Sequence, residues 1–118
     1  MALKINLKDG ESVYFGTSKV TAVHDGGYTI LVIDGGDLPV LKESETITLG
    51  DADTTEKRIY YHLQLYYLGG AKEHLRIAKT IAEVLSDDDS AVYEAALADI
   101  EKGRVFAGLR AMRRMAGL

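Results

Sequence analysis

The stretch DTTEKRIYYHLQLYYLGG, residues 53–70, marks the point at which the sequence changes from a strand-like to a helix-like pattern. Asp53, followed three residues later by Glu56, has the form of a capping box with Asp53 as the cap. The glycine pair Gly69-Gly70 is typical of a helix end. The sequence therefore predicts a helix that begins near residue 53 and reaches Leu68.

This predicted helix is apolar on almost its whole surface. At 100° per residue, Ile59, Leu63 and Tyr66 share one face, and the opposite face is apolar as well. A platform for stacking RNA bases needs exposed aromatic rings beside cations, and only two cations stand near, at the start of the helix. We therefore interpret the helix as core plus interface. The predicted interface residues are Ile59, Tyr60, Tyr61, Leu63, Leu65, Tyr66 and Tyr67.

Three more helices are expected after the glycine pair. They cover roughly 71–86, a segment that runs from the polar SDDDS sequence to about Lys102, and roughly 104–116. The acids of SDDDS and Ser90 suit the beginning of a helix, where the macrodipole favours negative charge. Gly103 ends the third helix.

The chain before residue 53 is typical of short strands. The strand-like segments are LKINL, SVYFG, KVTAV, YTILVI and LPVLK, separated by glycine-rich turns. Asp9-Gly10 is a hairpin signal of the type I′ kind, and Pro39 belongs at a strand start or at an edge. The predicted fold class is therefore α+β. A small antiparallel β lobe, a barrel or sandwich, spans 1–52, and a four-helix lobe spans 53–118.

Charge is distributed unevenly over the 118 residues, whose net charge is −4. Residues 1–101 carry more acids than bases, whereas residues 102–118 carry five cations and no acid. These cations either suit the C-terminal end of a helix dipole or form a binding patch, and charge alone leaves both interpretations open. No apolar run is long enough to span a membrane, no secretory signal is present and there is no cysteine, so we expect a cytoplasmic protein.

Catalytic and metal-binding motifs are not recognisable. His24 is expected in a turn, and His62 and His74 on helices, with no metal-ligand spacing among them. The SDDDS segment lacks the glycine and the distal glutamate of a calcium loop. We therefore expect no enzyme activity, no cofactor and no metal.

Four ordered blocks resemble the FlbT family of bacterial flagellar regulators. They are LKDGE near the N-terminus, PVLKESETI, DTTEKRIYYHLQLYYL and GRVFAGLRAMRRM. The family pattern has arginine where this chain has Lys42, proline where it has Thr55, and two tyrosines where it has Val105-Phe106. Lysine keeps the charge of arginine but lacks its planar fork of donors.

The first half also resembles the small RNA-binding CsrA fold. The matching residues are Gly10-Glu11, the segment 13–16, the strand 28–33, and Lys42-Glu43 before Ile47. This resemblance implies pairing of strands between two chains, and an RNA site at positions 3, 4 and 42.

The FlbT resemblance implies control of flagellin synthesis after transcription. The implied partners are the 5′ untranslated region of flagellin mRNA, with repression of translation and promotion of mRNA decay, and a FlaF-type flagellar protein. A homodimer is expected from the CsrA-like half. The residues that we assign to RNA binding are Lys4, Lys42, Lys57, Arg58, Arg104, Arg110, Arg113 and Arg114.

A second hypothesis makes the chain a protein-interaction module. In that case it is an adaptor or chaperone-like partner of FlaF or of flagellin, and its effects on RNA are indirect. The negative net charge and the apolar helix favour this hypothesis.

Overall fold

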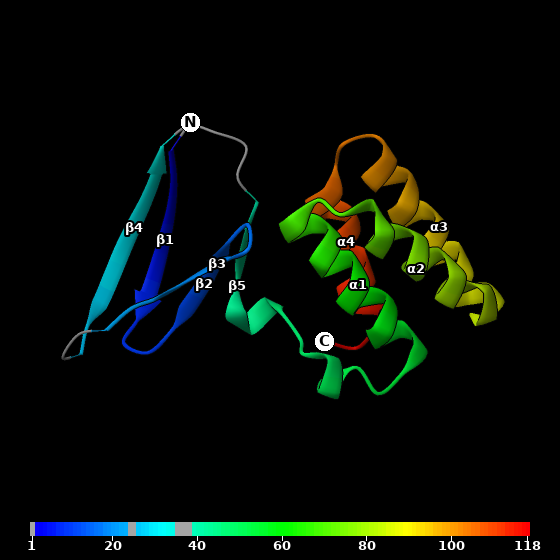
Figure 1. Ribbon diagram of the computed structural model, residues 1–118, viewed down its shortest axis with the longest axis horizontal. Coiled ribbons are helices and arrows are strands. Elements are labelled where there is room, and N and C mark those ends of the chain that lie inside the picture. Colours follow the sequence, from blue (N-terminus) through cyan, green and yellow to red (C-terminus); the bar gives the residue numbers. More distant parts are fainter. Residues whose placement is uncertain (1, 24–25, 35–38) are drawn as a thin grey trace. The chain divides into compact units, whose positions relative to one another are not determined.

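The computed structural model describes residues 2–23, 26–34 and 39–118. The chain divides into two compact units, which we describe separately as the strand unit, residues 1–46, and the helical unit, residues 47–118 (Figure 1). The predicted boundary, after residue 52, lies later in the chain than this division, because residues 47–52 group with the helices. The predictions for His24 and for most of the DGGD turn lie outside the described residues.

Two small antiparallel sheets form the strand unit. In one, β1 (Ala2–Lys8) pairs with β4 (Tyr28–Asp34). In the other, β2 (Ser12–Phe15) lies between β3 (Ser18–Thr21) and β5 (Val40–Lys42). A 3-10 helix, η1 (Glu43–Glu45), follows β5. Pro39 directly precedes the edge strand β5, as its missing N–H predicts.

The prediction of a hairpin at Asp9-Gly10 is wrong. Gly10 has a φ of +84° but Asp9 does not have a positive φ, and the N–H of Glu11 donates to the carbonyl of Lys8 at 3.0 Å. This pattern is that of a type II turn, which requires a positive φ only at its second central residue. The turn carries the chain from one sheet to the other, since β1 pairs with β4 and not with β2.

The core of the strand unit lies between these sheets. Ile5 and Leu7 of β1 are buried together with Val13 of β2 and Ala22. Because side chains alternate along a strand, the burial of Ile5 and Leu7 turns Lys4, Asn6 and Lys8 to the opposite face. This alternation is what exposes the first candidate surface described below.

Helices build the second unit. They are η2 (Leu49–Asp51), α1 (Thr55–Gly69), α2 (Lys72–Ile81), η3 (Ala82–Val84), α3 (Asp87–Glu101) and α4 (Val105–Met115). Helix α1 packs on α2 and α4, and α3 packs on α4. The mixed α+β fold with small antiparallel sheets is confirmed. The CsrA-like barrel and the plain four-helix lobe stay predictions, because the unit also contains η2 and η3.

Two helix starts differ from the prediction. Thr54, not Asp53, caps α1, and its hydroxyl accepts from the N–H of Lys57 at 3.1 Å. Asp53 instead pairs with the ammonium of Lys57 at 3.2 Å. Ser86 caps α3 by accepting from the N–H of Asp89, so Ser90 lies inside the helix rather than at its start.

Helices α3 and α4 approach closely at Gly108. A Cβ added to Gly108 would lie 2.6 Å from the carbonyl oxygen of Ala96 and 2.7 Å from Cγ1 of Ile100. Only a residue without a side chain fits this crossing. No helix of the described residues is long and apolar enough to cross a membrane.

Candidate nucleic-acid interface

The first candidate surface is the outer face of the β1–β4 sheet, which we call the strand surface. Its residues form cross-strand pairs: Lys4 with Val32, Asn6 with Ile30 and Lys8 with Tyr28. All six are exposed, and Tyr28 is 66% exposed. Directly opposite residues in an antiparallel pair have Cβ atoms about 5 Å apart. The face therefore presents an exposed phenol ring beside an ammonium group, which can stack on a base and pair with a phosphate.

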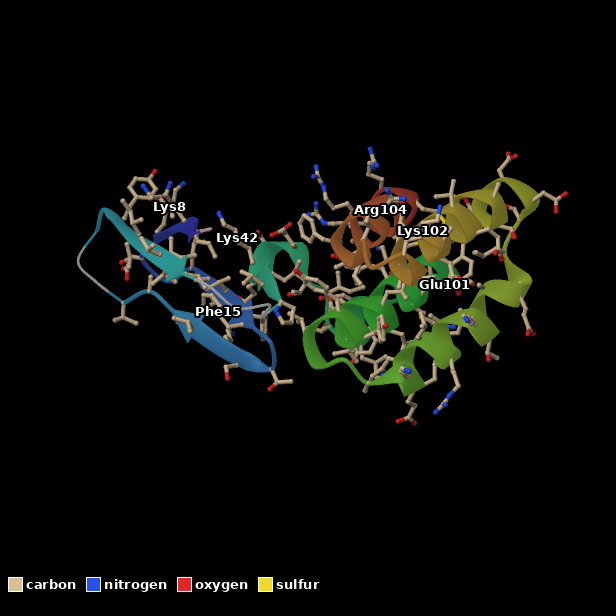
Figure 2. All side chains as sticks on the ribbon, turned by 90° about the horizontal axis from the view of Figure 1, so that it is seen from above. Lys8, Phe15, Lys42, Glu101, Lys102 and Arg104 are labelled. Atoms are coloured by element: carbon tan, nitrogen blue, oxygen red, sulfur yellow. The ribbon has the colours of Figure 1, made fainter. Side chains whose placement is uncertain are left out.

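Lys4, which the sequence analysis assigns to RNA binding, lies on this surface. Lys42 lies at the end of β5 in the other sheet and is half-buried, and its backbone N–H donates to Oε1 of Glu45 at 3.2 Å. The structure consequently places Lys4 and Lys42 on different sheets of the strand unit. Figure 2 labels Lys8 on β1 and Lys42 at the end of β5.

The second candidate surface lies on α4, and we call it the helix surface. The guanidinium of Arg110 lies over the ring of Phe106, 5.8 Å from its centroid, and that ring is 40% exposed. Arg114 is exposed one turn further along, and Arg113 is half-buried beside it. Within the described residues neither Arg110 nor Arg114 forms an ion pair with a carboxylate. Their charge is therefore available to an external anion.

Arg104 lies apart from these arginines. It precedes α4 and forms an ion pair with Asp99 of α3 at 3.1 Å, although its side chain is 62% exposed (Figure 2). An exposed pair of this kind contributes little to stability and opens readily. Arg104 can therefore still reach an anion, but only by leaving Asp99.

The two cations at the start of α1 are also engaged locally. Lys57 pairs with Asp53, and this hydrogen bond and charge hold the pKa of the Asp53 carboxyl below its ordinary value. Arg58 is exposed, and its Nε donates to the carbonyl of Ala52 at 3.4 Å. Their contacts fit a local role at the start of the helix at least as well as RNA binding.

The predicted interface residues of α1 divide into two groups. Ile59, Tyr60 and Leu63 are buried with exposures of 1% or less, which places them in the core. The other members are half-buried: Tyr61, Leu65, Tyr66 and Tyr67. Only this second group can contribute area to a partner without opening the helical unit.

Several residues of both surfaces were missed by sequence reasoning. Lys8 and Asn6 follow the same alternation as Lys4, so that pattern could have identified them. Tyr28 could not be identified, because both faces of YTILVI are apolar and the pairing of β4 was unknown. Phe106 stands four residues before Arg110, a spacing that brings two side chains of a helix together.

Metal-ligating side chains do not gather in the part of the chain that the structure describes. There, no group of three or more histidine and carboxylate side chains could hold a metal ion. His62 and His74 approach one another, with Nδ1 atoms 3.1 Å apart, and they are half-buried.

The strands and the helices define a two-unit α+β protein that carries exposed cations and exposed aromatic rings on each unit. Residues 3–117 match the family model described as flagellar protein FlbT. The chain belongs to this family.

Curated relatives agree with this assignment. The chain is 37% identical over 68 residues to the probable flagellum biosynthesis repressor protein FlbT 1 of Bradyrhizobium diazoefficiens, an alignment that covers 58% of this chain and 45% of the relative. It is 38% identical over 68 residues to the probable flagellum biosynthesis repressor protein FlbT of Rhodopseudomonas palustris strain TIE-1, with 58% and 52% covered. The chain spans about half the length of the curated relatives it matches. No solved structure matches the chain.

Proposed function

We propose that this chain regulates flagellin synthesis after transcription. It binds the 5′ untranslated region of flagellin mRNA in the cytoplasm, represses translation and promotes decay of the mRNA. Membership of the FlbT family and the name of the relatives, flagellum biosynthesis repressors, support the flagellar role. A FlaF-type flagellar protein and a second copy of the chain are the proposed protein partners.

The observation that carries RNA binding is the cross-strand pair of Lys8 and Tyr28. An ammonium beside an exposed phenol ring supplies the two contacts that an unpaired nucleotide offers, a phosphate and a base face. The pair of Arg110 and Phe106 repeats this combination on α4. Single-stranded RNA is the nucleic acid whose bases are free to stack in this way.

The experiment measures binding of the purified protein to a labelled flagellin leader RNA over a range of salt concentrations, with a scrambled RNA of equal length beside it. Tyr28→Ala is expected to weaken leader binding at least about five-fold, because stacking contributes about 1–3 kcal/mol per base. Tyr28→Phe keeps the ring and is expected to bind like the original protein.

Removal of cations tests the helix surface. Arg110→Ala with Arg114→Ala is expected to weaken binding and to lower the slope of log K against log salt by about 1.4, since each phosphate contact on a single strand contributes about 0.7. The matched control is Lys72→Ala with Arg76→Ala, which removes two exposed cations from α2. Equal losses in both double variants, or equal binding of leader and scrambled RNA, would contradict the proposal.

A specific observation also favours the second hypothesis, a protein-interaction module for FlaF or flagellin. Ile30 and Val32 are 61% and 58% exposed on the same strand as Tyr28, and an aliphatic side chain has no π-face to stack on a base. They suit an apolar protein surface. Titration with a purified FlaF-type protein or flagellin tests this hypothesis. Ile30→Lys and Val32→Lys should lose the protein binding, and because they add cations to the strand surface they should leave leader binding equal or stronger.

A further inference from the structure

The turn between α3 and α4 fixes the backbone of Arg104. Gly103 has a φ of +86° and its N–H donates to the carbonyl of Ile100 at 3.0 Å, while the N–H of Arg104 donates to the carbonyl of Asp99 at 2.8 Å. These two hydrogen bonds form a Schellman motif, in which a glycine with a positive φ ends a helix. The backbones of Asp99 and Arg104 are therefore joined independently of their side chains.

The side chains of the same two residues form an ion pair. A terminal nitrogen of the Arg104 guanidinium lies 3.1 Å from Oδ1 of Asp99, and the two side chains are 62% and 36% exposed. Because the Schellman motif already fixes both backbones, this pair orders less of the chain than a pair between distant segments would. The guanidinium of Arg104 is thus an exposed cation that is already bound to an anion of its own chain.

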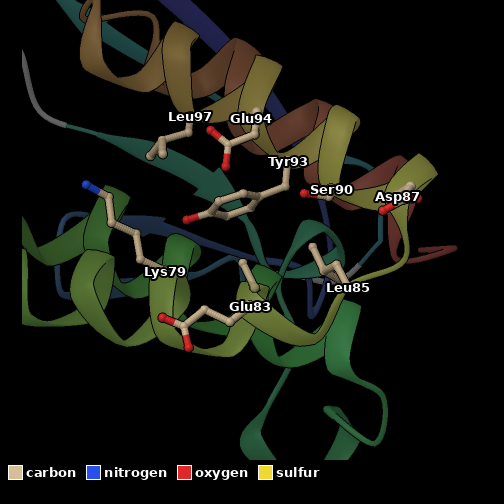
Figure 3. Close-up of a pocket in the computed structure, with 9 residues that line it drawn as sticks. Lys79, Glu83, Leu85, Asp87, Ser90, Tyr93, Glu94 and Leu97 are labelled. Carbon is tan, nitrogen blue, oxygen red and sulfur yellow. The ribbon is translucent and has the colours of Figure 1, made fainter.

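Asp99 stands where a helix disfavours an acid. It lies in the last turn of α3, which contains no base, and the negative end of the macrodipole favours a cation there. Glu101, the other acid of this turn, pairs with Lys79 of α2 at 3.7 Å. Figure 3 shows Lys79 at the edge of a cavity that α2 and α3 line. The helix therefore does not stabilise the charge of Asp99, whereas the guanidinium of Arg104 does.

We infer that Asp99 competes with RNA phosphate for Arg104, so that this ion pair is an autoinhibitory contact of the helical unit. The inference rests on the proposed function. A carboxylate and a phosphate both accept charge-assisted hydrogen bonds from a guanidinium, so RNA binds Arg104 only by displacing Asp99. Arg110 and Arg114 form no ion pair with a carboxylate among the described residues, and RNA reaches them without such a displacement.

The test measures binding of the leader RNA to the full chain and to variants of this turn. Asp99→Asn keeps the size of the side chain and removes its charge. It is expected to tighten leader binding about two- to five-fold, because the contribution of an exposed ion pair corresponds to a factor of about this size. Its melting temperature should stay close to that of the original protein, because the lost pair is offset by a more favourable helix dipole.

Two further variants show whether the gain acts through Arg104. In the double variant Asp99→Asn with Arg104→Ala, the gain relative to Arg104→Ala alone should disappear. Glu101→Gln is the matched control, because it removes one carboxylate charge from the same turn but releases Lys79 instead of Arg104. It should tighten leader binding less than Asp99→Asn does.

Three results would overturn the inference. They are unchanged leader binding in Asp99→Asn, an equal gain in the presence and absence of Arg104, and equal gains in Asp99→Asn and Glu101→Gln. The last two would assign the effect to the overall charge of the chain.

Tripolyphosphate separates this inference from the proposed function. It is titrated into the full chain and into Asp99→Asn, and the NMR signal of the Arg104 Nε–H group follows its binding. If neither protein binds leader RNA, the proposed function fails, whereas tighter binding of tripolyphosphate by Asp99→Asn still supports competition at Arg104. Equal binding of tripolyphosphate by the two proteins would exclude that competition.

Discussion

His62 and His74 face one another between α1 and α2, with Nδ1 atoms 3.1 Å apart and rings stacked at an interplanar angle of 25°. A hydrogen bond between two Nδ1 atoms requires one donor and one acceptor, so at least one ring is neutral. Burial, followed by the charge of His74, lowers the pKa of His62 below its ordinary value of 6.5.

This pair predicts a loss of stability in weak acid. Below about pH 6.5 the unfolded His62 takes up a proton that the folded protein resists, so the unfolded state binds more protons and the free energy of unfolding falls. The melting temperature should drop between about pH 7.5 and pH 5.5, and His62→Gln should reduce this drop. In an NMR titration His74→Gln should raise the pKa of His62. Titration of His62 at or above 6.5 in the original protein would contradict the prediction.

Gly108→Ala should destabilise the helical unit. The added methyl group would meet the backbone oxygen of Ala96 and the side chain of Ile100, and α3 and α4 would have to separate. We expect a loss of about 1–3 kcal/mol in the free energy of unfolding, measured by urea denaturation. Gly50→Ala is the control, because its Cβ would meet nothing nearer than Oγ1 of Thr48 at 3.8 Å. Equal effects of the two substitutions would show that the close approach is unimportant.

Replacement of Gln64 should also lower the free energy of unfolding. Its side chain is buried, accepts from the N–H of Ile47 at 3.0 Å and donates to the carbonyl of Ile47 at 2.7 Å. Gln64→Leu leaves both backbone groups unpaired, which should lower the free energy of unfolding by roughly 2–5 kcal/mol. Thr80→Val, at an exposed position of α2, should stay within about 0.5 kcal/mol of the original protein. Similar urea midpoints for the original protein and Gln64→Leu would refute this role.

The proposed homodimer makes a prediction for the half-buried side of α1. If Leu65 contributes to the contact between two copies, Leu65→Arg should convert a dimer to a monomer in sedimentation velocity, because a charge would enter an apolar contact. Leu49→Arg, at a residue that is 64% exposed, should leave the dimer intact. Circular dichroism should show that both variants fold. An original protein that sediments as a monomer at every concentration would exclude the dimer.

The bounds of the elements were largely predictable from the sequence, and their pairing was not. The change of period near residue 53 reports which side chains share a face, and the predicted helix reaching Leu68 agrees with α1 to within a few residues. The partner of β1 depends on contacts far apart in the chain, and a DG turn fits both a hairpin and a crossing between sheets. Because the partner of β1 could not be predicted, the cross-strand pairing of Lys8 with Tyr28 could not be predicted either.

Local chemistry also decided details that a pattern leaves open. Asp53 and Thr54 are both good caps; the structure has Thr54 as the cap of α1, and the carboxylate of Asp53 pairs with the ammonium of Lys57. The clustering of Arg110 with Arg113 and Arg114 followed from helical spacing alone, whereas the pairing of Arg104 with Asp99 needed the positions of α3 and α4. The close approach at Gly108 could not be predicted, since a glycine inside a helix does not reveal which element packs against it.

The arginines of the helix surface belong to a chain whose net charge is −4, and this has a kinetic consequence. The Debye length at physiological ionic strength is about 8 Å, so beyond that distance the approaching RNA is screened both from these cations and from the net negative charge of the chain. Attraction begins only at contact. Added salt should therefore leave the association rate constant of RNA nearly unchanged, while it raises the dissociation rate constant of the bound complex.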